Sequence, residues 1–487
     1  MTKSLERSSY RVTFTVLLLG AISYSLLQSL VVPALPTIQR QLHTSQSTVT
    51  WVLTAYLLSA SIFTPILGRV GDMVGKERML LATLVALGIG SVLGGLSHSI
   101  GLLIFARAVQ GIGGGVLPLS FGIIRDEFPP DKVASGVGFI AAMIAVGGGA
   151  GIVLAGPIVS HLNFHWLFWI PLVIIVIAAV TTQLFVPESP VRTPGRVNWW
   201  AAVLLSGWLV ALLVAVSEAP SWGWGSARVI GLIALAVAIG VVWIVVEARS
   251  RQPLVDMKMM RLPAVWTNNL VAFLFGMGMY SVIAFLPEFL QTPTSTGYGF
   301  GSTVIQSGLF LLPLTVAMFV FGLLSGRIAA NIGSKAAVII GSIASCGAYI
   351  MLAFASTQPW EIYAASTLLG VGLGLAFSAM SNLIVQAVPP TQTGVASGMN
   401  ANVRTIGGAF GAAVMSSIVA SKLLGSGYPA ASGYTRGFAF LAVMTLIAAV
   451  AAIFIPTARP GEPVPVHDPH LDHAELAMVP GGTITDA

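Results

Sequence analysis

Long apolar stretches recur along almost the whole chain, and they limit its fold more than any other feature. Each stretch is about 20 residues long, the length that a helix needs to cross a bilayer. Only 8% of the 487 residues are charged, too few to coat a soluble domain of this size. Lipid offers no partner to free backbone groups, and the apolar stretches are continuous rather than alternating. The sequence therefore predicts an all-α integral membrane protein.

Fourteen membrane spans are expected, and their even number places both termini on one side of the membrane. They cover 12–32, 50–68, 79–98, 101–124, 134–160, 166–186, 198–217, 228–247, 265–290, 303–326, 336–356, 361–386, 393–421 and 437–456. The first apolar stretch follows the basic residues Lys3, Arg7 and Arg11 and lacks a small-residue cleavage site. It is therefore interpreted as the first span rather than as a signal peptide.

The basic residues indicate which side the termini occupy. Of 23 Lys and Arg residues, 17 fall on the same side as the termini and four on the other, while Arg107 and Arg404 lie within spans. Positive charge favours the cytoplasmic side, so both termini of this multi-pass protein are expected in the cytoplasm, with the spans in the cell (inner or plasma) membrane. Basic loops facing anionic lipid account for the pI near 9.6 without a nucleic-acid partner. The single cysteine, Cys346, excludes a disulfide framework.

An internal repeat divides the chain. Four segments return in the same order at an offset of about 260 residues. Gly68-Arg69-Val70 returns as Gly326-Arg327-Ile328; Gly111, Gly113 and Gly115 return as Gly370, Gly372 and Gly374; Pro129-Pro130 returns as Pro389-Pro390; and Val133-Ala134-Ser135-Gly136 returns as Val395-Ala396-Ser397-Gly398. Spans seven and eight have no counterpart.

The repeat predicts two six-helix bundles with an inserted helix pair. The expected domains are 1–190 for the first bundle, 191–262 for the inserted pair with its cytoplasmic linkers, 263–460 for the second bundle, and 461–487 for a disordered cytoplasmic tail. Parallel repeats of this kind place a substrate cavity between the bundles near the membrane midplane. A structural scaffold without transport is the alternative.

Three segments resemble the major facilitator superfamily, and specifically its fourteen-helix drug/proton antiporter branch of multidrug efflux type. The segment from Gly68 to Arg78 is similar to the loop signature between spans two and three, and Arg107 lies in a segment similar to the fourth-span motif. The residues that resemble the fifth-span antiporter motif are Gly147, Gly151, Gly156 and Pro157. The resemblance implies a secondary transporter, not an enzyme, that exports lipophilic small molecules by proton antiport through alternating access. The proton gradient would drive it, without a cofactor.

The chain departs from the family pattern at two places. Leu27, with Gln28 beside it, stands where the family has a first-span aspartate, so the usual proton-binding or cation-binding carboxylate is missing. In the fifth span, Ile152 replaces a proline, and Pro157 comes later.

The loop signature is a candidate gate consisting of Gly68, Asp72, Gly75, Lys76 and Arg78. A carboxylate at Asp72 can accept hydrogen bonds from a helix N-terminus and interact with the positive end of its dipole. The resemblance implies that this helix is span thirteen, near Thr393, and Arg78 is expected to hold the same carboxylate. Such a latch would stabilise the outward-facing state. The alternative is a charged loop in contact with solvent.

Ionisable residues within spans are candidates for proton coupling. Arg107 and Arg404 are costly in lipid and should face a cavity or a partner. Glu288, near the outer end of span nine, is the acid placed to bind and release a proton. The alternatives are a structural hydrogen-bonding role for Arg107 and a water-facing position for Glu288.

Aromatic, methionine and glutamine side chains define a candidate substrate cavity, because they form an adaptable pocket. They are Tyr24, Gln28, Tyr56, Phe275, Met277 and Tyr280. The glycine pairs Gly111/Gly115, Gly147/Gly151 and Gly407/Gly411 have the spacing that allows close helix packing. The tail contains His467, His470 and His473, but its composition favours disorder over a metal site, and no metal is predicted.

The expected partners are a small lipophilic substrate, protons and membrane lipid, with the chain acting as a monomer. Because the spans contain two arginines and at most one acid, an exporter of lipids or anionic metabolites is an alternative. An uptake symporter or a uniporter on the same fold is a further alternative, as is a receptor that binds without transport.

Overall fold

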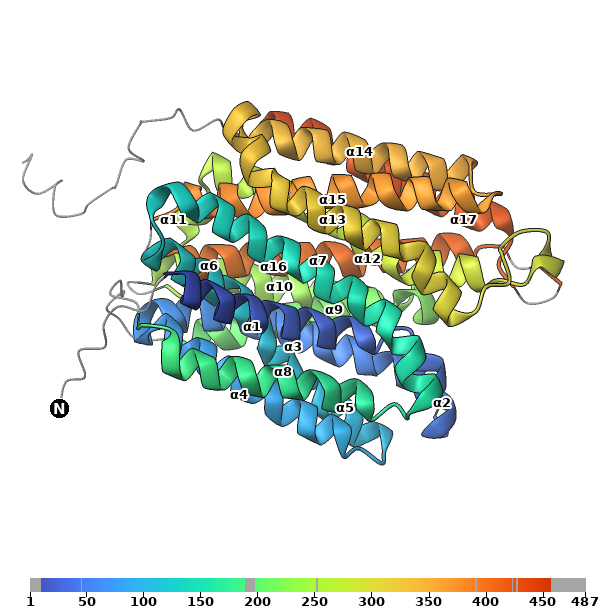
Figure 1. Cartoon of the computed structure of the whole chain (residues 1–487), viewed down its shortest axis with the longest axis horizontal. Helices are drawn as coiled ribbons and strands as arrows, with labels where there is room; N and C mark the ends of the chain where they lie inside the picture. Colours follow the sequence, from blue (N-terminus) through green and yellow to red (C-terminus); the bar gives the residue numbers. More distant parts are fainter. Residues whose placement is uncertain are drawn as a thin grey trace, which may run out of the picture. The chain divides into compact units, whose positions relative to one another are not determined.

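The computed structural model describes residues 10–44, 46–188, 198–250, 253–389, 392–422, 424–425 and 428–456, and within them the chain forms helices and no strands (Figure 1). The first half contains α1 Tyr10–Leu30, α2 Leu35–Gln41, α3 Gln46–Val74, α4 Lys76–Gly95, α5 Ile100–Gly111, η1 Ile112–Gly115, α6 Val116–Glu127, α7 Pro130–His161 and α8 Trp166–Phe185. Then follow α9 Trp199–Trp222, α10 Ala227–Arg249, α11 Met257–Met260, α12 Pro263–Gln291, η2 Thr294–Thr296, α13 Val304–Ile332, α14 Ser334–Phe354, α15 Pro359–Ala387, α16 Thr393–Ala420 and α17 Ala431–Ile453.

The helices follow the predicted spans. Thirteen helices in the described residues are long and apolar enough to cross a membrane, with α5, η1 and α6 counted as one, Ile100–Glu127. The 32-residue α7 covers the remaining predicted span. The predicted end of span two at residue 68 was wrong, because α3 continues to Val74 and includes most of the loop signature. The turn comes at Gly75, whose φ of 132° is one that side-chain-bearing residues rarely adopt.

The repeat is visible in how the helices pack. In the first half, α1 packs against α7, α3 against α5, and α4 against α5 and α8; in the second half, α12 packs against α16, α13 against α15, and α14 against α15 and α17. One apolar core is formed by residues of the first half joined by Val385, and a second core is formed by residues of the second half. The limits of the predicted domains stay a prediction.

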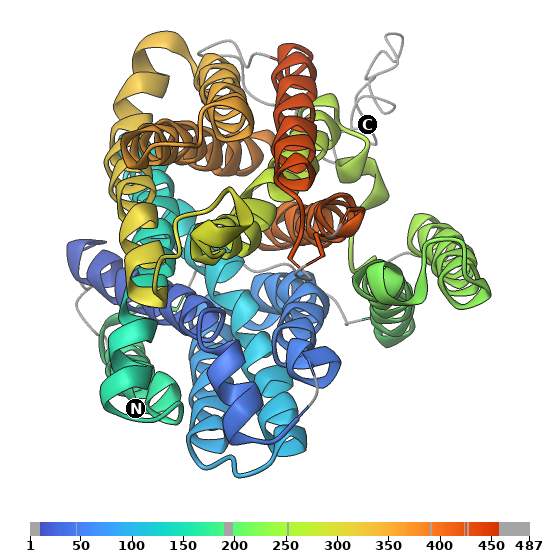
Figure 2. The same ribbon diagram turned by 90° about the vertical axis from the view of Figure 1, so that its right-hand side faces the viewer.

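The two halves meet along two symmetric seams. One seam joins α3 to α16, and the other joins α7 to α13. The inserted helices α9 and α10 pack on each other, and α9 also lies against α3 and α16. Figure 2 shows this pair in green beside the other helices. Leu205 and Leu209 of α9 share an apolar cluster with Ile66 of α3 and Met399 of α16, so the insertion covers the first seam.

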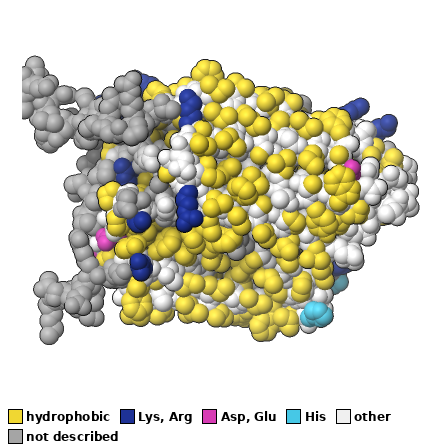
Figure 3. All heavy atoms as spheres, turned by 45° about the horizontal axis from the view of Figure 1, so that its top comes forward, with side chains coloured by type: hydrophobic (Ala, Val, Ile, Leu, Met, Phe, Trp, Pro, Cys, Tyr) yellow, Lys and Arg dark blue, Asp and Glu magenta, His cyan; other side chains and the backbone are white. Residues whose placement is uncertain are grey.

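The outer surface suits lipid. On the face shown in Figure 3, hydrophobic side chains form a broad band, and most of the Lys and Arg side chains lie at one end of it. Helix α10 adds exposed apolar residues, among them Ile230, Val237 and Val241. A surface of this kind is stable where the hydrocarbon core of a membrane replaces water.

Candidate functional site

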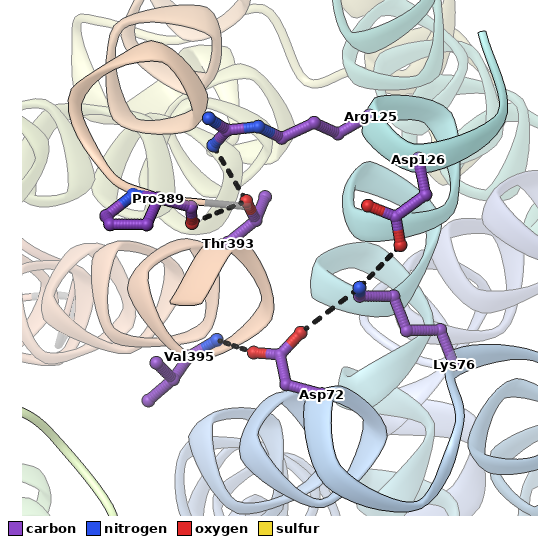
Figure 4. A network of polar contacts seen from close by, with 7 residues as sticks. All are labelled: Asp72, Lys76, Arg125, Asp126, Pro389, Thr393 and Val395. Carbon is purple, nitrogen blue, oxygen red and sulfur yellow. Dashed lines mark hydrogen bonds and ion pairs between the residues drawn. The ribbon is translucent and has the colours of Figure 1, made fainter. Parts of the chain in front are cut away.

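The end of α3 touches the start of α16 across the first seam (Figure 4). Asp72 is buried, and its Oδ2 accepts a hydrogen bond from the backbone N–H of Val395 at 3.3 Å. Val395 is the third residue of α16, so its N–H has no partner within that helix, and the carboxylate lies at the positive end of the helix dipole. The contact expected between Asp72 and the helix that begins at Thr393 is therefore present, while its gating role stays a prediction.

Two carboxylates hold the buried ammonium group of Lys76. Its Nζ lies 2.6 Å from Oδ2 of Asp126 in α6 and 3.5 Å from Oδ1 of Asp72. The expected partnership of Arg78 with Asp72 was wrong, because Arg78 is mostly exposed and its Nε lies 3.2 Å from Oε2 of Glu188. Helix α4 begins at Lys76, and Arg78 follows two residues later in the same helix. Two residues correspond to a rotation of about 200° around the helix axis, so the side chain of Arg78 points away from α3.

A second contact across this seam was not predicted from the sequence. The Nη1 of Arg125, near the end of α6, donates to Oγ1 of Thr393 at 2.8 Å (Figure 4). The same Nη1 also donates to the carbonyl of Val385. The signal in the sequence is the Arg125-Asp126 pair directly after the fourth predicted span. We define the latch as Asp72, Lys76, Arg125 and Asp126 with the α16 N-terminus.

Glycines bring the backbones of α3 and α16 into contact at the latch. A Cβ placed on Gly68 would lie 2.5 Å from the carbonyl oxygen of Gly394, so no side chain fits there. The symmetric contact between α13 and α7 is looser, since a Cβ on Gly326 would lie 3.3 Å from Oγ of Ser135. Ala330 occupies the position in α13 that corresponds to Asp72. The charged latch is therefore present at only one of the two seams.

The glycines of α7 face two different helices. A Cβ on Gly147 would lie 2.9 Å from Cβ of Ser25 in α1, and Gly151 faces the same helix. Gly149 faces Thr315 of α13, and a Cβ on Gly156 would lie 2.8 Å from Cγ1 of Ile305 in α13. Pro157 lies within α7, next to Gly156. These glycines therefore serve packing within the first half and across the second seam.

Arg107 joins three helices of the first half. Its side chain is fully buried; Nε donates to the carbonyl of Val52 at 3.2 Å, and Nη1 donates to the carbonyl of Leu27 at 3.4 Å and to Oε1 of Gln110 at 2.7 Å. Its guanidinium carbon lies 4.2 Å from the ring centroid of Tyr56. Leu27 stands where the family has its first-span aspartate, and its backbone carbonyl is what Arg107 contacts at that position.

Arg404 of α16 lies where the halves face each other. It is 8% exposed, and its guanidinium carbon lies 4.3 Å from the ring centroid of Phe377 in α15. It lines a void of about 10 Å³, together with Leu117 and Phe121 of α6. Tyr24 and Tyr280 are within electrostatic range of its charge, and the void that it lines has walls from both halves.

The six predicted cavity residues separate into two groups. Tyr24 and Tyr56 stack with ring centroids 6.2 Å apart, and Tyr24 interacts with both arginines. Tyr280 interacts with Arg404, and Gln28 is half-buried in α1. Tyr24 and Tyr56 belong to the apolar core of the first half, and Phe275 and Met277 belong to the apolar core of the second half.

Glu288 lies near the end of α12, and its side chain is exposed. Its Oε1 accepts a hydrogen bond from Oη of Tyr434 at 3.1 Å. In the following loop, Tyr298 lies near this pair, and partial burial raises the pKa of Tyr298. Arg107 and Arg404 do not contact Glu288 in the described structure. The histidines of the tail lie outside the described residues, and within those residues His, Cys, Asp and Glu form no group able to hold a metal.

Comparisons with known proteins agree with this geometry. The family model described as Major Facilitator Superfamily matches residues 17–412. The chain is 30% identical over 450 residues to the cephamycin export protein CmcT of Amycolatopsis lactamdurans, covering 90% of this chain and 91% of that one. It is 26% identical over 420 residues to the tetracenomycin C resistance and export protein of Streptomyces glaucescens, covering 84% of this chain and 76% of that one.

A further relative and a solved structure agree. The multidrug transporter protein MdtP of Bacillus subtilis is 27% identical over 430 residues, covering 87% of this chain and 77% of that one. The crystal structure of the human organic anion transporter MFSD10 matches the fold with a TM-score of 0.69 at 18% identity, covering 92% of this chain and all of that one. With a family model matched across most of its length, the chain belongs to the major facilitator superfamily and is a multi-pass membrane transporter rather than an enzyme.

Proposed function

We propose that this transporter exports small lipophilic molecules across the cell membrane by alternating access. The observation that carries the proposal is the latch, which holds the two halves together at one end through Asp72 and Val395. The names of three relatives, for cephamycin export, tetracenomycin C resistance and export, and multidrug transport, support export and a role in antibiotic resistance. The chain would act as a monomer, and small lipophilic molecules would reach the seam from lipid or cytoplasm.

The latch would work at the cytoplasmic end. The positive-inside rule places both termini in the cytoplasm, and the same rule places the basic loop from Arg69 to Arg78 there. A closed latch then corresponds to a conformation shut toward the cytoplasm. For cargo to enter from inside, α16 must move away from α3, which breaks the contact between Asp72 and Val395 and the contacts of Arg125.

Proton antiport is the proposed driving force. An arginine stays charged in proteins, so Arg107 and Arg404 cannot carry the proton themselves and would act through their charge. A carboxyl group can, and among the described residues the carboxylate of Glu288 accepts a hydrogen bond from one side chain, that of Tyr434. Glu288 is therefore the proposed proton-binding group. It lies near the end of α12 that would face the outside of the cell.

Transport by the purified chain in proteoliposomes tests the function. A pH jump should drive antibiotic-type substrates against their concentration gradient, in the direction opposite to proton flow, and a protonophore should stop the movement. Movement of substrate together with protons would identify an uptake symporter instead. Binding without flux, for every substrate of the panel, would contradict the transport proposal itself.

A further inference from the structure

Arg404 is a buried cation that the described protein does not neutralise. Among the described residues, its buried Nε has no hydrogen-bond partner, and its guanidinium carbon lies 4.3 Å from the ring centroid of Phe377. The ion pairs in the described part of the chain involve Lys76 and Arg78 and neither of the span arginines. Because a buried charge without a counter-ion is costly, this arrangement indicates a place for a negative group.

Arg107 adds a second positive charge nearby. Arg107 contacts the ring of Tyr56, which stacks against Tyr24, and Tyr24 is within electrostatic range of both guanidinium groups. Arg107 carries one further unpartnered atom, Nη2. Arg107 is fully buried behind Tyr56, whereas Arg404 lines the void, so Arg404 is the cation that a bound molecule would meet.

The space beside Arg404 is closed in this conformation. The void of about 10 Å³ holds no more than a water molecule. Its walls come from both halves: Leu117 and Phe121 on one side, and Ser397 and Asn400 on the other. Ser397 contributes a buried hydroxyl without a partner. The void lies between α6, α15 and α16, along the part of α16 that runs from Ser397 near the latch to Arg404, so opening the latch would widen it and let a molecule reach the guanidinium.

We propose that the cargo is an organic anion with an apolar body, and that its negative group binds the guanidinium of Arg404 while the latch is open. This inference rests on the proposed export function and specifies its substrate class. Phe377, Tyr24 and Tyr280 supply the aromatic surface for the apolar body. A lipophilic cation would meet two positive charges and, among the described residues, no carboxylate beside them.

Two matched dyes test the charge preference. 8-Anilinonaphthalene-1-sulfonate and N-phenyl-1-naphthylamine share a ring system, and only the first carries a negative group. Binding is measured from the fluorescence of each dye on the detergent-purified full chain, with protein-free micelles subtracted. Arg404→Gln should weaken binding of the sulfonate roughly ten- to a hundredfold, the range for one charge-assisted hydrogen bond, and should change binding of the neutral dye less than about twofold.

Two controls separate charge from structure. Arg404→Lys keeps the positive charge and should retain most of the sulfonate affinity, and Arg327→Gln removes an exposed arginine of the same half and should change nothing. Thermal unfolding of each variant checks that it folds. Equal affinity of wild type and Arg404→Gln for the sulfonate would overturn the anion site, as would a wild-type preference for the neutral dye.

Flux measurements separate this inference from the proposed function. If wild-type proteoliposomes transport the neutral dye but not the sulfonate, export stands and the anion site fails. If they transport the sulfonate and Arg404→Gln does not, the site is supported. If they transport neither dye nor any antibiotic-type substrate, the proposed function fails, and this inference fails with it.

Discussion

The substitution Asp72→Asn tests the latch directly. Asparagine keeps the shape and an acceptor oxygen but removes the charge that faces Val395 and the N-terminus of α16. Lys76 keeps its closer partner, Asp126, so no cation is left unpaired. The charge-dependent share of the contact amounts to about 2 kcal/mol, from a charged hydrogen bond and the helix dipole. The equilibrium should therefore move about 30-fold toward the conformation open at the latch.

Cysteine labelling measures this shift. Ser397 is buried at the seam, and Ser397→Cys in a Cys346→Ala background gives one reporter. With inside-out vesicles, a membrane-impermeant maleimide should label this cysteine about 30-fold faster in Asp72→Asn than in the parent chain. Export should be lost, while the amount of protein in the membrane stays unchanged.

A neighbouring acid supplies the control for Asp72→Asn. Glu77→Gln removes an equal charge from the same loop, and Glu77 contacts no residue of α16 in the described structure. Labelling at the parental rate in Asp72→Asn would refute the latch. An equal acceleration in Glu77→Gln would show that the loop acts through its net charge rather than through the Val395 contact.

Three further predictions concern packing, stability and coupling. Gly149→Leu places a side chain against Thr315 and should abolish efflux without lowering membrane expression; Gly101→Leu, which has open space, should leave efflux normal. Arg107→Ala removes three hydrogen bonds and should lower the free energy of unfolding by about 2–4 kcal/mol, seen as a lower thermal midpoint; an unchanged midpoint would contradict a structural role for the hydrogen bonds of Arg107. The Glu288→Gln variant should exchange substrate normally, but its transport should no longer respond to a pH jump. Transport that responds fully to the pH jump would argue against proton binding at Glu288.

The sequence predicted the parts of the site that depend on local chemistry. A carboxylate beside a helix end was expected from the loop signature, and Asp72 does meet the N-terminus of α16. The sequence did not predict that Lys76 rather than Arg78 would hold Asp72, because this depends on where α4 begins. Phe275 and Met277 were placed in the cavity because of their type, but the rotation of α12 turns them into the core.

The sequence by itself determined the membrane fold, the repeat and the family. These follow from the length of the apolar stretches and from the order of short segments, which are properties of the linear chain. Only the tertiary structure decided which charges meet. Arg125 reaches Thr393 although 268 positions separate them, and Arg404 remains without an ionic partner in the described residues because the side chain packed against its guanidinium is the ring of Phe377 rather than a carboxylate. Such contacts depend on the rotation and spacing of packed helices, which local sequence does not specify.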